Sequence, residues 1–171
     1  MKLSRHGQAA ITDLFIAVAV FIILITITTL IWNLYNVRLE ARLDYDTMLL
    51  RSYHLVEGFI RSPGYPEDWE AWALPNETTQ MFGLAQDDHI LSEAKIAKLA
   101  ALSDPSKSPY HDLKRVMKIA LYEYYFLLKT ENGIIVYSGG AIPSGKYAVN
   151  LARLVVYRGQ PHILEFTIWK P

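Results

Sequence analysis

The chain of 171 residues has room for one ordinary domain and an anchoring segment, because domains commonly contain roughly 100–150 residues. Its 17 lysines and arginines balance 17 aspartates and glutamates, so it lacks the basic surplus of nucleic-acid-binding proteins, and we expect no nucleic-acid partner. The absence of cysteine excludes disulfides, thiolate metal sites and a cysteine nucleophile.

The first element in chain order is an apolar run from Leu14 to Trp32 without a charged residue. Its length matches the roughly 20 helical residues that cross about 30 Å of hydrocarbon. Lys2 and Arg5 precede the run, so the positive-inside rule places the N-terminus in the cytoplasm and everything after Tyr35 outside. We therefore predict a single-pass anchor in the cell membrane over residues 8–35.

A cleaved secretory signal is the alternative interpretation of this run. Such signals have apolar regions of about 7–15 residues followed by a small-x-small cleavage site. Here the apolar run continues into Ile31–Tyr35 and no such site follows it. The pattern favours an anchor that stays on the protein.

The residues before the run carry a more specific resemblance. A short basic leader, the segment Gly7-Gln8-Ala9-Ala10-Ile11-Thr12-Asp13 and the apolar helix together resemble the class III signal peptide of archaeal type IV pilin-like proteins. In that family a prepilin-type peptidase cuts on the cytoplasmic side, and the apolar stretch stays as anchor and assembly helix. The resemblance implies residues 1–7 as a cytoplasmic leader, a cut between Gly7 and Gln8, and other pilin-like subunits as partners of the helix.

Asp13 is the acidic residue that the resemblance singles out for assembly. The family places a glutamate at the fifth mature residue, whereas a cut before Gln8 makes Thr12 the fifth and Asp13 the sixth. Either the register differs by one residue or the cut lies elsewhere. The resemblance implies that Asp13 pairs with the N-terminal amine of an adjacent subunit; alternatively, Thr12 or Asp13 only caps the start of the helix.

After Tyr35, apolar residues spaced mostly by three and four predict a stalk helix over residues 36–61, interrupted only by Gly58. Proline, glycine and aromatic residues then predict a loop over residues 62–91. Its tryptophans either cover the core or form an exposed aromatic surface for a glycan or partner. Asn76 begins an Asn-Glu-Thr glycosylation sequon in this loop.

Two short helices are predicted over residues 92–120, as Ser92–Leu102 and Pro109–Ala120, with Ser92 and Ser108 as N-caps. The spacing of apolar and aromatic residues then changes to that typical of strands. Two hairpins are predicted over residues 122–169. Asn132-Gly133 and Gly159-Gln160 mark their turns.

The predicted fold class is α+β. A long N-terminal transmembrane and stalk helix would pack on a four-stranded antiparallel sheet, with two short helices beside it, and residues 36–171 would form the exported domain. One long helix on such a sheet is also the architecture of pilin-like proteins.

The sequence contains no recognisable catalytic constellation. Asp87-Asp88-His89, with Glu93 nearby, is the one local cluster with ligand chemistry, and we expect it to be a polar turn before the Ser92 helix. The histidines lack metal-ligand spacing, and Gly139-Gly140 lacks the spacing of a dinucleotide loop. We expect no metal, no cofactor and no enzymatic activity.

These expectations lead to two main hypotheses about function, and a third, an exported enzyme, has only the Asp87-Asp88-His89 cluster behind it. The first is a structural subunit, either abundant or minor, of a type IV pilus-like filament or cell-surface assembly. The second is a single-pass receptor or binding module whose exported domain never polymerises. Removal of the leader separates them, since a simple signal anchor keeps Met1 to Gly7.

Overall fold

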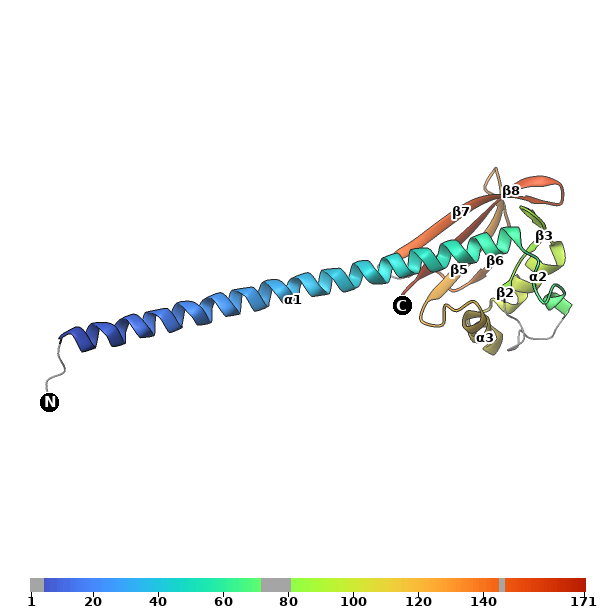
Figure 1. Ribbon diagram of the computed structural model, residues 1–171. Helices are drawn as coiled ribbons and strands as arrows, with labels where there is room; N and C mark the ends of the chain where they lie inside the picture. Colours follow the sequence, from blue (N-terminus) through green and yellow to red (C-terminus); the bar gives the residue numbers. More distant parts are fainter. Residues whose placement is uncertain (1–4, 72–80, 145–146) are drawn as a thin grey trace. The chain divides into compact units, whose positions relative to one another are not determined.

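The computed structural model describes residues 5–71, 81–144 and 147–171, and for residues 5–10 it describes the backbone alone (Figure 1). Helix α1 spans Arg5–Arg61. The chain divides into two compact units, Met1–Asp44 and Tyr45–Pro171. The first unit is helical wherever it is described, and the second contains the rest of α1 and all the strands.

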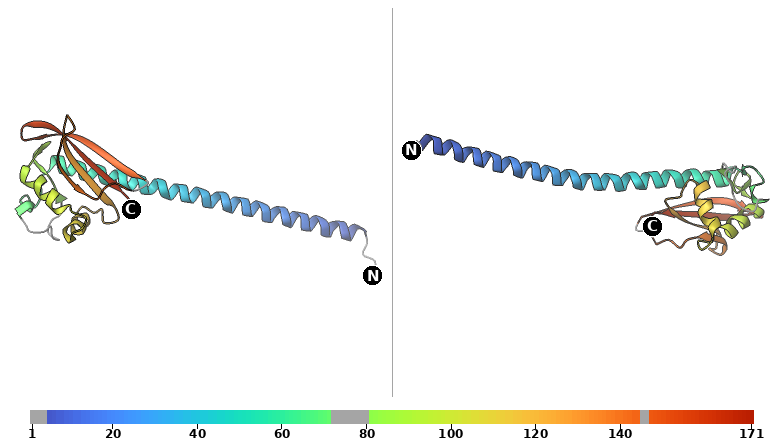
Figure 2. Two further views of the ribbon diagram at one scale, coloured as in Figure 1. Left: turned by 180° about the vertical axis from the view of Figure 1, so that it is seen from behind. Right: turned by 90° about the horizontal axis from the view of Figure 1, so that it is seen from below.

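Within the second unit, α1 buries one face against the sheet (Figure 2). Met48, Ser52, Val56 and Phe59 follow one another at intervals of four and three residues and are buried, as a helix face requires. An ion pair of 3.0 Å between Glu57 of α1 and Arg153 of the sheet adds a polar contact. The predicted stalk helix is therefore present.

Helix α1 ends where the sequence predicts a break. Pro63 and Gly64 follow Arg61, and proline disfavours the helical conformation in the residue before it. Gly64 has φ of +92°, a conformation that favours glycine. The N–H of Ser62 donates to the carbonyl of Gly58 at 3.2 Å and closes the last turn.

Four long strands form two hairpins, as predicted. They are β5 (Glu123–Thr130), β6 (Ile135–Gly140), β7 (Ala148–Tyr157) and β8 (Gln160–Trp169). They lie in the order β7-β8-β5-β6, and each adjacent pair is antiparallel. The second turn lies one residue earlier than predicted, because Arg158 and Gly159 carry the positive φ values of a two-residue hairpin loop.

The prediction of a four-stranded antiparallel sheet is wrong, because the sheet has six strands and is mixed. The short strands β3 (Ala85–Asp87) and β4 (Ile90–Leu91) extend it beyond β7, and β4 runs parallel to β7. The backbone of His89, in the turn between β3 and β4, bonds to both α1 and β7. Its N–H donates to the carbonyl of Ile60 in α1, and its carbonyl accepts from the N–H of Val156 in β7, both at 2.8 Å.

The segment predicted as a loop over residues 62–91 thus contains regular structure. Besides β3 and β4, it has the strand pair β1 (Gly64–Tyr65) and β2 (Met81–Phe82) and the 3₁₀ helix η1 (Trp69–Ala71). The Trp69 indole is buried and donates to the carbonyl of Gly83 at 2.9 Å, so this tryptophan covers the core.

Helices α2 (Glu93–Leu102) and α3 (Ser108–Val116) are present, with differences at their ends. Ser92 occupies the N-cap position of α2 but makes no side-chain cap bond, and the N-cap of α3 is Lys107 instead of Ser108. α3 ends four residues before the predicted Ala120. Lys118 has φ of +59°, which stops the helix.

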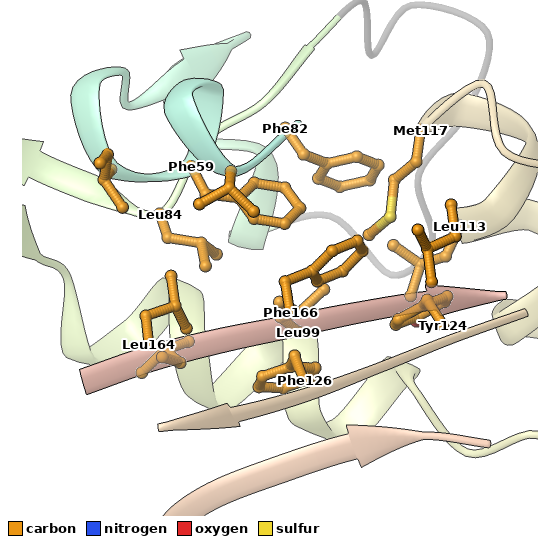
Figure 3. Packing of buried hydrophobic residues seen from close by; sticks show 14 of the residues in the cluster. Phe59, Phe82, Leu84, Leu99, Leu113, Met117, Tyr124, Phe126, Leu164 and Phe166 are labelled. Carbon is orange, nitrogen blue, oxygen red and sulfur yellow. The ribbon is translucent and has the colours of Figure 1, made fainter. Parts of the chain in front are cut away.

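One core unites α1, α2, α3 and the inner face of the sheet (Figure 3). Aromatic rings run through it: Tyr110 stacks on Tyr124 at 5.0 Å, Tyr124 stacks on Phe166 at 5.7 Å, and Phe166 meets the edge of Phe59 at 5.7 Å. The phenol of Tyr110 donates to Glu123, which also accepts a bond from the buried Lys114 ammonium. The core belongs to the second unit alone.

This packing predicts that residues 36–171, made without the anchor, are soluble and unfold cooperatively. The sheet, α2, α3 and the part of α1 that packs on the sheet all lie after Asp44. Urea unfolding followed by fluorescence and by circular dichroism should give coincident single transitions. An aggregated product, or one without a transition, would contradict the prediction.

The core also predicts a loss of stability at high pH. Burial raises the pKa of Tyr110 and of Tyr124 above the ordinary 10.0, and the hydrogen bond to Glu123 raises that of Tyr110 further. Below pH 10 both phenols are protonated in the folded and unfolded states, so they leave stability unchanged. Above it the unfolded state releases protons that the folded state keeps, and each phenol lowers stability by up to about 1.4 kcal/mol per pH unit.

The control for this pH dependence is Tyr124→Phe. It removes one titrating phenol together with the 2.8 Å hydrogen bond to Ser103. Urea midpoints measured between about pH 9 and pH 11 should therefore fall less steeply for the variant than for the wild type. Parallel slopes would contradict the assignment to Tyr124.

Candidate functional site

The apolar segment of α1 is the candidate site. Every side chain from Ile11 to Tyr35 is exposed, and the large apolar ones keep 47–71% of their surface accessible. The helix is long and apolar enough to cross a membrane, and none of its most apolar window is buried within the described chain. The uncharged run over residues 14–32 therefore presents a continuous apolar surface that no other part of the described chain covers.

Three threonine hydroxyls inside this segment are satisfied locally. The hydroxyls of Thr26, Thr28 and Thr29 each donate to the carbonyl four residues earlier at 2.8 Å. Hydroxyls bonded in this way need no water, so the threonines do not oppose an apolar environment.

The residues of the predicted cut and the predicted assembly residue lie on the same helix. Gly7 and Gln8 lie in the backbone of α1, and Asp13 lies in its interior with an exposed side chain. Because α1 begins at Arg5, neither Thr12 nor Asp13 stands at the helix start of the uncut chain. Asn76 and Trp72 lie outside the described residues.

No family model matches this chain, and no curated protein matches its sequence. The assignment of a function therefore depends on the residues and their geometry.

The Asp87-Asp88-His89 cluster forms the turn between β3 and β4. The carboxylate of Asp88 lies 3.0 Å from Nδ1 of His89, and the carboxylate of Asp87 accepts the N–H of Asp88 at 2.8 Å. Glu93 does not join them, since it forms an ion pair with Arg158. Among the described residues, no group of three or more histidine, aspartate or glutamate side chains could hold a metal ion.

Gly139 and Gly140 are required by packing. A Cβ on Gly140 would lie 2.2 Å from the carbonyl oxygen of Tyr124, and Gly140 has φ of +101°. A Cβ on Gly139 would lie 2.6 Å from the Cβ of Ser103. These close approaches explain why two glycines stand here, at a pair whose spacing is not that of a dinucleotide loop.

The sequence analysis did not predict a groove between the end of α1 and the end of α3, which we name the α1–α3 groove. Its volume is about 420 Å³, and its lining includes the apolar residues Leu55, Phe82 and Met117, which we name its floor. Arg51, His54 and Lys118 also line it, and we name these basic residues its rim. The signals that could have indicated it are Gly58, isolated within a helix, and the nearby basic residues.

Proposed function

We propose that this protein is a structural subunit of a type IV pilus-like filament or cell-surface assembly, anchored in the membrane by α1 and without catalytic activity. The observation that carries the proposal is the exposed, uncharged run of α1 over residues 14–32, which precedes a second compact unit. A helix with such a surface needs lipid or other apolar helices around it.

Anchor and assembly element are the same segment in this proposal. In the membrane the exposed side chains of residues 14–32 contact lipid, and in a filament they contact the equivalent side chains of neighbouring copies. The exchange keeps the same apolar surface out of water, so a subunit can leave the bilayer without exposing it. The second unit, Tyr45–Pro171, then lies outside the cell.

The experiment that tests the proposal is mass spectrometry of the N-terminus of the protein from its own host. We expect the mature chain to begin at Gln8, because Gly7 lies between the basic leader and the apolar helix. A matched Gly7→Val variant, with a branched side chain before the cut, should keep residues 1–7. Native protein that retains Met1 to Gly7 would contradict the filament role and favour the single-pass binding module.

A further inference from the structure

The rim of the α1–α3 groove carries positive charge that the described chain does not neutralise. The guanidinium of Arg51 donates to the carbonyl of Lys118 at 3.0 Å, which holds both residues beside the groove. None of the ion pairs among the described residues involves Arg51 or Lys118. A carboxylate from another molecule would find two cations there.

Gly58 gives a second, independent indication that something occupies the groove. It lies in the interior of α1 and lines the groove. A Cβ at this position would have the carbonyl oxygen of Phe82, 3.9 Å away, as its nearest contact, so packing among the described residues does not require glycine. Glycine in a helix interior costs about 1 kcal/mol relative to alanine. Its benefit is space, because a glycine lets another backbone approach closely.

A surface with the complementary properties lies elsewhere on the same helix. Asp46, Leu50 and Tyr53 are spaced by four and three residues, so they share one face of α1, which we name the α1 stripe. Leu50 is 60% exposed and Tyr53 47% exposed. Asp46 is exposed and takes part in none of the ion pairs of the described residues.

We propose that the α1–α3 groove of one copy receives the α1 stripe of a second copy, with Leu50 over the apolar floor and Asp46 beside Arg51 and Lys118. The inference rests on the proposed function and specifies a contact within the assembly. Arg51 and Leu55 of the groove lie about 100° and 140° round the helix from Leu50, so the Leu50 side chain of a chain does not enter that chain's own groove. The contact is heterologous, and each bound copy leaves one groove and one stripe free for the next.

The test is disulfide cross-linking between two differently tagged full-length chains produced together in the native host. The chain contains no cysteine, so only introduced thiols react. One chain carries Leu50→Cys in the stripe, and the other carries Met81→Cys at the groove, where Met81 is 43% exposed. We expect a cross-linked heterodimer after mild oxidation of membranes and of sheared filaments.

The matched control replaces Leu50→Cys with Leu49→Cys. Leu49 is also an exposed leucine, at 38%, but it lies about 100° further round the helix. Leu50→Cys should cross-link severalfold more than Leu49→Cys. Equal yields would overturn the assignment of the stripe.

A charge exchange tests the ionic part. Asp46→Arg in the Leu50→Cys chain, or Lys118→Asp in the Met81→Cys chain, should each reduce the cross-linked product, and both together should restore it. Two losses without restoration would overturn the pairing of Asp46 with the rim.

Filaments scored by electron microscopy separate this inference from the proposed function. If filaments form and Leu50→Cys cross-links no more than Leu49→Cys does, the groove contact is overturned. The filament role then stays intact. Specific cross-links in membranes, from chains that keep Met1 to Gly7 and form no filament, support the contact and overturn the filament role.

Discussion

Asp13→Asn is expected to insert into the membrane and lose its leader normally, yet to be absent from filaments. Insertion should tolerate Asp13 or its replacement, because one carboxylate costs about 2.5–3.5 kcal/mol at the bilayer centre and less near the interface. Asp13 lies before the uncharged run that begins at Leu14, and its side chain is exposed on α1. In the proposed filament the same carboxylate would be surrounded by apolar helices.

A carboxylate in that environment needs a partner, because an unpaired charge is costly away from water. In the proposed filament this partner would be the N-terminal amine that a cut before Gln8 creates on a neighbouring copy, as the resemblance to archaeal pilin-like proteins implies. Asparagine keeps the size and hydrogen-bonding capacity of aspartate and removes only the charge, so its effect isolates the ionic contact. Asp13→Glu keeps the charge and should keep incorporation.

The measurement scores three quantities separately: membrane insertion by carbonate extraction, leader removal by mass spectrometry, and incorporation by immunoblot of sheared filaments. Asp13→Ala should behave as Asp13→Asn does. Filaments that contain Asp13→Asn at wild-type levels would contradict the pairing.

The largest effect on stability is expected for Gly83→Ala. A Cβ at Gly83 would lie 1.9 Å from the carbonyl oxygen of Ser62 and 2.3 Å from the backbone nitrogen of Gly64. Both contacts are with backbone, so relief requires the chain to move. The movement would strain neighbouring hydrogen bonds, since the N–H of Ala85 donates to the carbonyl of Ser62 at 3.2 Å. We expect a loss at or above the upper end of the roughly 1–3 kcal/mol typical of overpacking.

Gly58→Ala is the matched control for this substitution. Its nearest contact is 3.9 Å away, so the methyl group fits and the helix gains about 1 kcal/mol. Urea unfolding of residues 36–171 should move the midpoint down for Gly83→Ala and up for Gly58→Ala. A change of less than about 0.5 kcal/mol for Gly83→Ala would mean that the backbone adapts at little cost.

Local patterns in the sequence predicted the long elements of the fold. The uninterrupted apolar run, followed by apolar residues spaced by three and four over residues 36–61, predicts α1. Pro63-Gly64 predicts the end of α1, and Asn132-Gly133 predicts the turn between β5 and β6. Each signal lies within a few residues of the structure that it predicts. No signal in the sequence indicates the positive φ values at Lys118 and Arg158. The predicted end of α3 is therefore four residues too late, and the predicted second turn is one residue too late.

The additional strands and the groove depend on contacts between distant residues. Ile90 and Leu91 form a strand because His89 bonds to the end of α1 and to β7. A segment of two residues is too short to show the alternation of apolar and polar residues by which a strand is predicted. The groove combines α1, β2 and the end of α3, which lie far apart in the sequence. The leader and Asp13, by contrast, were identified from a short motif, and they remain predictions until the experiments above are done.

The position of β8 constrains when the protein can fold during its synthesis. β8 pairs with β7 over ten residue positions and with β5 over eight, and β7 and β5 are not neighbours. Until residues 160–169 have been made, β5 and β6 can pair only with each other, and β7 has no partner on that side. The sheet of a newly made copy therefore cannot be completed until β8 has emerged, and in the proposed assembly the association of the second unit with other copies would follow the synthesis of β8.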